Sequence, residues 1–218
     1  MDLNQARFNM IEQQIRPWEV LDPQVLNLLS VVRREDFVPL AHKALAFVDM
    51  EIPLGTAPGQ VMLAPRVQAR LLQELALKNT DKVLEVGTGS GFMAALMAHQ
   101  AASVLSLESD ASLAAQAQTH LQKAGVRNVT VRTADGSQGA TSDAPFDAIL
   151  LSGSVAEVPT ALLQQLKDGG RLVAIVGEEP MMRATVVTRT NDSFTTTEPW
   201  DCNAPRLAGF AEPSHFAF

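Results

Sequence analysis

The stretch DKVLEVGTGSGF, residues 81–92, places three glycines directly after a run of strand-forming apolar residues. Gly87, Gly89 and Gly91 predict a turn between a buried strand and the helix that follows it. Backbone N–H groups in such a turn, next to the start of a helix, can approach a ligand closely. Four interpretations are open at this point: a dinucleotide site, a nucleoside triphosphate site, a site for a sulfonium cofactor, or a tight turn without a ligand.

From residue 82 onward, strand patterns alternate with helix patterns. Strands are expected at 82–87, 103–109, 128–135, 146–153 and 169–177, and helices at 91–100, 110–125 and 158–166. Such alternation implies a doubly wound, mostly parallel sheet covered on both faces, which is an α/β fold. Segments 184–190 and 193–199 flank a polar turn and predict a closing antiparallel strand pair.

The first eighty residues are predicted to be mainly helical. Helices are expected at 3–15, at 22–32 with Asp22 as N-cap, briefly after Pro39, and at 65–77. Segment 50–65 contains three prolines and two glycines, so it is expected to be loop or edge structure. We therefore expect one domain over residues 1–218, with a helical N-terminal region (1–80) preceding an α/β core (81–218).

Composition limits the partners and the location. The chain has a net charge of -7 and no cluster of lysine and arginine, so no nucleic-acid partner is expected. No apolar run approaches the roughly 18 residues of a membrane span, and residues 1–10 lack the apolar region of a signal peptide. Cys202 is the only cysteine, which fits a reducing compartment. We expect a cytoplasmic protein that binds no membrane; its oligomeric state is not indicated.

Motifs for several other chemistries are absent. The sequence has no G-x-x-x-x-G-K-[ST] loop, which excludes the triphosphate interpretation, and no G-x-S-x-G elbow. The four histidines show no metal-ligand spacing with each other or with Cys202, so no metal is expected; they are His42, His99, His120 and His215.

The glycine spacing favours one of the remaining ligands. A dinucleotide fingerprint reads G-x-G-x-x-G. Here the pattern is G-x-G-x-G, and Phe92 stands where the third glycine of that fingerprint would be. Glu85 precedes the first glycine by two residues, so the whole pattern is E-x-G-x-G-x-G. This pattern resembles motif I of the class I S-adenosylmethionine-dependent methyltransferases.

Two further acids occur where that class places them. Glu108 ends the second strand of the α/β part, where a carboxylate can accept hydrogen bonds from both hydroxyls of a ribose. Asp135 ends the third strand, and the resemblance implies that it takes the adenine amino group while Gly136 lets the loop pass closely. Alternatively, each acid is a solvated strand-end or turn residue, and Glu85 either holds the cofactor's ammonium group or is structural. The cofactor-binding residues that the resemblance implies are Glu85, Gly87, Thr88, Gly89, Gly91, Glu108, Asp135, Gly136 and Ser152.

Longer blocks resemble one family within this class, the protein-L-isoaspartate O-methyltransferases. They are VVRREDFVP at 31–39, VLEVGTGSGF at 83–92 and VPTALLQQLKDGGRLVAIVGEE at 158–179, and the similarity covers roughly residues 20 to 180. The resemblance implies methyl transfer from S-adenosylmethionine to an isoaspartyl carboxylate in damaged proteins or peptides. The ester then closes to a succinimide, which can reopen as aspartate.

The chain departs from this family in the loop that meets the substrate. The family loop reads G-Q-T-[IV]-S-x-P, whereas residues 59–65 read GQVMLAP. The substrate loop expected here consists of Gln60, Val61, Met62 and Leu63. Leu63 replaces the family serine, so no catalytic residue is assigned. Three functions stay open: an isoaspartyl methyltransferase, a family member with another acceptor, and a cofactor-binding protein that transfers nothing.

Arg33 and Arg34 form a basic pair after the second expected helix. Two interpretations are open for this pair: attraction of an acidic peptide, or a solvated helix end.

Overall fold

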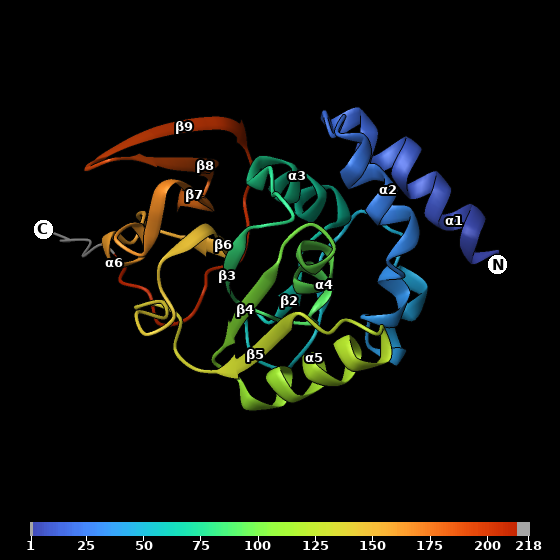
Figure 1. Cartoon of the computed structure of the whole chain (residues 1–218). Helices are drawn as coiled ribbons and strands as arrows, with labels where there is room; N and C mark the ends of the chain where they lie inside the picture. The colour runs from blue at the N-terminus through green and yellow to red at the C-terminus, as the bar shows by residue number, and fades with distance from the viewer. Residues whose placement is uncertain (1, 213–218) are drawn as a thin grey trace, which may run out of the picture.

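The computed structural model describes residues 2–212, and its centre is a seven-stranded sheet in the order β5-β4-β3-β6-β7-β8-β9 (Figure 1). The strands are β3 (Lys82–Val86), β4 (Ser103–Glu108), β5 (Val129–Thr133), β6 (Phe146–Val155), β7 (Leu166–Glu178), β8 (Met181–Thr190) and β9 (Ser193–Asp201). Strands β3 to β7 pair in parallel, while β8 and β9 add antiparallel strands at one edge. This arrangement confirms the predicted doubly wound fold and its closing antiparallel pair.

Helices pack on both faces because the central strands are apolar on both sides. Val83 of β3 belongs to one apolar core, together with α3 (Pro65–Leu75), α4 (Phe92–Ala98) and the N-terminal helices. Leu84, its neighbour, points to a second core that includes Leu162 of the short α6 (Thr160–Leu163). The long α5 (Ala111–Lys123) connects β4 to β5, and the carboxylate of Asp110 caps its N-terminus.

The N-terminal region is helical, as expected, but less regular than predicted. Helix α1 (Leu3–Met10) continues as a π-helical turn at Ile11–Ile15, and a 3₁₀ turn follows at Arg16–Trp18. Helix α2 (Pro23–Val31) starts at the Asp22 cap, and 3₁₀ turns follow at Arg34–Asp36 and Leu40–Leu45. Figure 1 shows α1 and α2 on the opposite side of the molecule from the β8–β9 pair. Within residues 2–212, no helix is long and apolar enough to cross a bilayer.

Element boundaries differ from the predicted ones in two places. Helix α3 ends at Leu75 rather than at residue 77, because Ala76 adopts a left-handed conformation with φ of 41°. Helix α6 has four residues instead of nine, because Leu166 already pairs with Phe146 as the first residue of β7. Both differences arise where chain reversal and strand pairing override a helical pattern.

The strand order creates a crevice at the carboxyl end of β3. Strand β3 pairs with β4 on one side and with β6 on the other, so the chain connections reverse direction there. Ligands of open α/β sheets bind at such a switch point. The small ribbon of β1 (Ile52–Pro53) and β2 (Val61–Met62), and a C-terminal segment bridged to Ser154, both reach this end of the sheet.

Candidate active site

The glycine turn has a backbone that side chains would not tolerate. Gly87, Gly89 and Gly91 have φ values of 91°, 52° and 85°, in the left-handed region that favours glycine. A Cβ on Gly91 would also lie 3.2 Å from the Cβ of Ala117 on α5. The sequence motif is therefore explained by both conformation and close packing, and the turn leaves its backbone open toward the crevice.

Glu108 lies over this turn and faces the crevice. Its Oε2 accepts a hydrogen bond from the backbone N–H of Gly89 at 2.8 Å, and its Oε1 accepts one from Asp110 at 3.1 Å. A carboxylate has about four acceptor positions, so capacity remains for a pair of hydroxyl donors. The side chain is thus held in place by the motif that the cofactor would contact.

Glu85 is fully buried in the middle of the sheet. Its two oxygens accept hydrogen bonds from Ser106 Oγ at 2.6 Å and Ser152 Oγ at 2.8 Å. Burial raises the pKa of the Glu85 carboxyl to about 7, against the hydrogen bonds from these two serines, which lower it. Near neutral pH this carboxyl is therefore close to its point of titration, and an ammonium group beside it would favour the charged form.

A cavity of about 170 Å³ occupies the crevice and collects much of the predicted site. Its lining includes Gly87, Gly89, Glu108, Gly136, Ser152, Gln60 and Val61. Gly136 is needed there, because a Cβ at this position would collide with the side chain of Val86. A second, much smaller cavity of about 20 Å³ continues from it and is lined by Thr88, Glu85, Ser152, Met62 and Leu63.

Two predicted residues do not line either cavity. Gly91 caps the N-terminus of α4, and Asp135 accepts a hydrogen bond from the backbone N–H of Ser137 at 2.9 Å. The Asp135 carboxylate lies close to Gly209, where an added Cβ would be 2.6 Å from Oδ1. Contact with an adenine amino group at Asp135 therefore stays a prediction.

The substrate loop closes over the cavity and is fastened at one point to α5. Gln60 donates a hydrogen bond from Nε2 to Oδ2 of Asp110 at 2.9 Å. Met62 and Leu63 are buried, and Leu63 faces the second cavity opposite Ser152. An apolar side chain therefore stands beside Glu85 and Ser152, where the resemblance implied the acceptor.

Arg34 anchors the same loop from behind, which corrects both sequence interpretations for this member of the basic pair. The Arg34 side chain is buried and donates to Ala46 O at 3.1 Å, to Leu63 O at 2.8 Å, and to Gln68. Burial lowers the pKa of its guanidinium to about 9, so it stays charged at neutral pH. Neither a peptide nor solvent reaches it.

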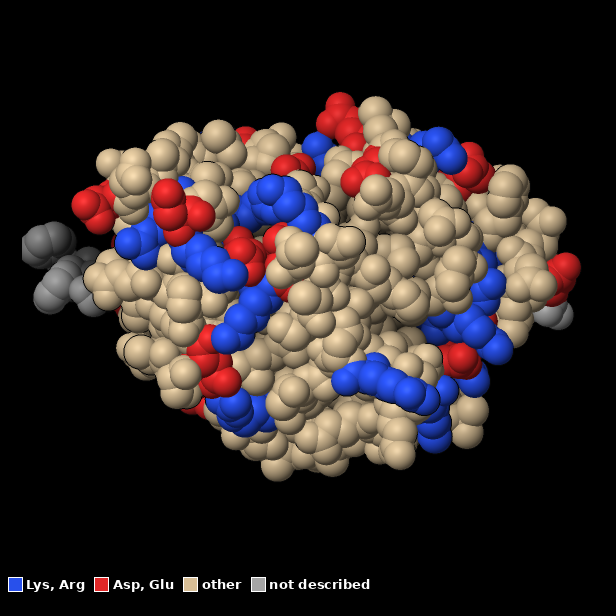
Figure 2. Space-filling view, in the orientation of Figure 1, with Lys and Arg blue, Asp and Glu red and all other residues tan. Residues whose placement is uncertain are grey.

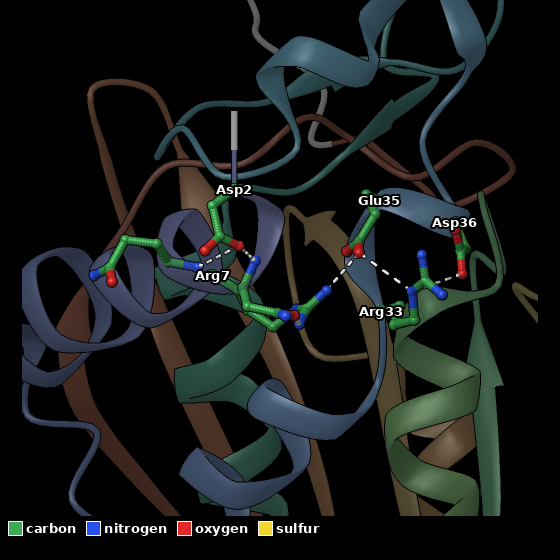
Figure 3. A network of polar contacts seen from close by, with 7 residues as sticks. Asp2, Arg7, Arg33, Glu35 and Asp36 are labelled. Atoms are coloured by element: carbon green, nitrogen blue, oxygen red, sulfur yellow. Dashed lines mark hydrogen bonds and ion pairs between the residues drawn. The ribbon is translucent and has the colours of Figure 1, made fainter.

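Its neighbour Arg33 is exposed and belongs to an ion-pair network that also includes the buried side chains of Arg7 and Glu35 (Figure 3). Glu35 lies between Arg7 and Arg33, and Arg33 also pairs with Asp36 at 3.3 Å. This network lies on the N-terminal region, and none of its members lines the two cavities.

The C-terminal segment is a part of the site that sequence reasoning missed. Ser154, near the end of β6, donates its N–H to Pro205 O at 2.8 Å and accepts at its own carbonyl from the Leu207 N–H at 2.9 Å. The Leu207 side chain then packs against the turn, 2.8 Å from the position of a Cβ on Gly87. The only signal for this in the sequence is NAPRLAGF at residues 203–210, a loose match to a V-P-L element that the family commonly has near its C-terminus.

The residues present fit S-adenosylmethionine. The glycine turn and Glu108 suit the sugar part, Gly136 leaves space at the next strand, and Glu85 lies where an ammonium group would be stabilised. Within residues 2–212, no group of three or more metal-ligating side chains could hold a metal ion, and His215 lies outside this range. Fold and site together define a class I S-adenosylmethionine-dependent methyltransferase.

Comparison with known proteins places the chain within that class. The sequence model of the protein-L-isoaspartate(D-aspartate) O-methyltransferase family matches residues 5–202. The chain belongs to this family.

Individual relatives agree with that placement. The chain is 39% identical to a protein-L-isoaspartate O-methyltransferase of Koribacter versatilis over 203 residues, which cover 93% of this chain and 90% of the relative. It is 40% identical to one of Syntrophus aciditrophicus over 188 residues, covering 86% and 85% of the two chains.

A solved structure shares the fold. It comes from Plasmodium falciparum, is assigned as a β-aspartate methyltransferase and contains S-adenosyl-L-homocysteine. It superposes with a TM-score of 0.79 at 19% identity, covering 95% of this chain and 98% of its own. At this identity the likeness concerns the fold alone.

Proposed function

We propose that this methyltransferase esterifies the carboxylate of isoaspartyl residues in damaged proteins or peptides. Family membership supports the reaction type, and one geometric observation carries it. The cavity of about 170 Å³ is lined by Glu108, by the glycine turn, by Ser152 and by the start of the substrate loop. The residues proposed for the cofactor and those proposed for the acceptor therefore adjoin one another in the same crevice.

The reaction requires little from the protein beyond the correct placement of cofactor and acceptor. When bound, S-adenosylmethionine supplies a methyl group on a positively charged sulfur, which leaves as a neutral thioether. An acceptor carboxylate is already ionised near neutral pH, so no general base is required. The glycine turn and Glu108 would orient one end, while Met62 and Leu63 exclude water from the other.

Leu63 supports a second candidate, a family member with a different acceptor. Its side chain is apolar and faces the second cavity, where the family serine would offer a hydrogen bond. A third possibility, binding without transfer, follows from the same change.

Methylation of an isoaspartyl peptide with labelled cofactor tests the proposal directly. The matched control is the same peptide with an ordinary aspartyl linkage. Base-labile label in the isoaspartyl peptide alone supports the proposed acceptor. Label in a cell lysate, with none in the peptide, would favour another acceptor, and no label anywhere would favour binding without transfer.

We also propose that the enzyme works in the cytoplasm on protein or peptide substrates, without a nucleic-acid or membrane partner. The net charge of -7 supports the expectation of no nucleic-acid partner, and Figure 2 shows acidic and basic side chains interspersed on the face drawn. Cell fractionation and a nucleic-acid retention assay at low salt test these points. Recovery in the membrane pellet or tight retention would contradict them.

A further inference from the structure

Arg206 is the only lysine or arginine that lines either of the two cavities, as far as residues 2–212 show. It lies in the C-terminal segment, where the chain departs from the family's V-P-L element. Its backbone is bridged to Ser154 of β6. On the other side, an added Cβ on Gly59 of the substrate loop would lie 3.4 Å from the Arg206 carbonyl oxygen. Arg206 is therefore held between the sheet and the loop.

The strand order places this guanidinium at the acceptor end. Glu108 ends β4, the glycine turn follows β3, and Ser152 is on β6, so the cavity crosses the sheet in that order. Arg206 reaches farther in the same direction, because Nη1 donates to the Gly177 carbonyl of β7 at 2.8 Å. If Glu108 takes the ribose, the reacting end lies toward β6 and β7, next to Arg206.

The Arg206 guanidinium already forms an ion pair with a carboxylate, that of Glu212. Glu212 Oε1 lies 2.9 Å from Arg206 Nε, and about half of the Glu212 side chain is exposed. The Arg206 side chain is mostly covered, with 26% exposed. Glu212 thus places a carboxylate next to Arg206, the one cation of the cavity lining within the described residues. A carboxylate is also the reacting group of an isoaspartyl acceptor.

We infer that Arg206 binds the acceptor carboxylate, and that Glu212 holds its place until the acceptor arrives. This rests on the proposed function. Arg206 would hold one acceptor oxygen by a charge-assisted hydrogen bond and leave the other free to react. That oxygen forms a bond to the methyl carbon while the carbon–sulfur bond breaks toward sulfur, and no proton moves. The ester is neutral, so it loses the ion pair, and Glu212 can return and release the product.

The test measures binding as well as turnover. An isoaspartyl peptide is titrated into the protein saturated with S-adenosylhomocysteine, and KM and kcat are measured separately. Arg206→Met should weaken peptide binding and raise KM by at least about tenfold, since it removes one partner of a partly buried charge pair. Arg206→Lys should restore part of the loss. Glu212→Gln should tighten peptide binding severalfold.

The controls separate this role from others. Arg183→Met removes an arginine that pairs with Glu198 at 2.8 Å on the surface, and it should leave peptide binding unchanged. S-adenosylhomocysteine affinity should stay within about twofold in every variant. A comparable loss of S-adenosylhomocysteine affinity in Arg206→Met would assign the guanidinium to the cofactor's carboxylate instead. Equal peptide binding by wild type and Arg206→Met would overturn the inference about Arg206 and leave the proposed function intact. A wild-type protein that neither binds nor methylates the peptide would overturn the isoaspartyl function, and this assignment with it.

Discussion

At the scale of single residues, Leu63 decides how well a carboxylate acceptor is received. It is 5% exposed and faces the second cavity, where a serine could donate a hydrogen bond. A missing hydrogen bond to a buried polar group costs about 1–3 kcal/mol, which is roughly a tenfold to hundredfold loss of rate. We expect weak isoaspartyl methylation by the wild type and faster methylation by Leu63→Ser.

The same change should lower stability, because it removes buried apolar atoms at a cost of about 2–4 kcal/mol. Labelled-cofactor kinetics and urea unfolding of both proteins, with Leu63→Ala as the control for lost volume, test the two effects. Robust wild-type turnover that falls in Leu63→Ser would contradict the placement of the acceptor beside residue 63.

Glu85 should make stability depend on pH. Its folded pKa of about 7 lies above the ordinary value of 4.5 for a glutamate, so folding takes up a proton between these pH values. The stabilisation from this group is complete below about pH 4.5 and is lost as pH rises through 7, by up to about 3 kcal/mol. Urea unfolding of wild type and Glu85→Gln at several pH values should show the variant gaining relative stability as pH rises. Parallel pH profiles would show that the carboxyl titrates normally.

Glu108 should contribute mainly to cofactor affinity. Glu108→Ala removes the acceptor over the glycine turn and should cost about 1.5–3 kcal/mol of S-adenosylhomocysteine binding, the scale of hydrogen bonds to charged groups. Glu108→Gln keeps the shape of the side chain and loses its charge. Its affinity for S-adenosylhomocysteine should lie between those of wild type and Glu108→Ala. Calorimetry measures all three proteins, with NAD as a ligand that should give no heat. Unchanged affinity in Glu108→Ala would remove this residue from the site.

The sequence predicted the acids and glycines of the site because their signals are local. Gly87 and Glu108 sit at strand ends that the chain pattern itself marks. The anchoring contacts of Arg34 and the proposed role of Arg206 could not be found this way, since both depend on packing between distant segments. Arg33 and Arg34 are adjacent and chemically alike, yet one is exposed and the other holds the carbonyl of Leu63, 29 residues away.

At the scale of elements, the order and type of the strands were predictable and their lengths were not. Strand β7 begins at Leu166, within a segment whose pattern is helical, because pairing with Phe146 extends the sheet. Helix α3 stops at Leu75, and its last carbonyl accepts a hydrogen bond from Arg171 of β7. Each boundary depends on a partner that is distant in the sequence.

Arg34 joins three elements, and its loss should loosen all of them. Arg34→Met would leave the carbonyls of Ala46 and Leu63 and the amide oxygen of Gln68 without their donor. Unsatisfied buried groups cost about 1–3 kcal/mol each, so we expect destabilisation of about 3 kcal/mol or more. Arg33→Met, the exposed neighbour, should change the unfolding free energy by less than about 1 kcal/mol. Equal effects in urea unfolding would show that the loop needs no such anchor.

At the scale of the whole molecule, one apolar core joins the N-terminal helices to the sheet. Ile15 from the N-terminal region, Leu71 from α3 and Val83 from β3 all belong to it. This supports the assignment of residues 1–218 to one domain, which stays a prediction. We therefore expect one stable body, with two thin segments that close its crevice: the substrate loop, and residues 204–208.

These two segments should open to admit the cofactor. The cavity of about 170 Å³ is smaller than the roughly 300–1,000 Å³ typical of ligand sites, so its lining must move when a ligand enters. Residues 204–208 are the weaker side, because Ser154 provides their only ladder-like backbone pairing with the sheet within the described range. Few backbone hydrogen bonds imply a low free energy of local opening.

Hydrogen exchange of the free and S-adenosylhomocysteine-bound protein measures this opening. We expect fast exchange at Leu207 in the free protein and clear slowing at residues 54–62 and 204–208 on binding. The β8–β9 pair serves as the control, since it lines neither cavity and should exchange at the same rate in both states. Leu207→Ala, which removes the side chain packed against Gly87, should exchange faster still and take up the ligand more quickly. Protection at Leu207 in the free protein equal to that of β3, with no change on binding, would show that the crevice admits its ligand by another route.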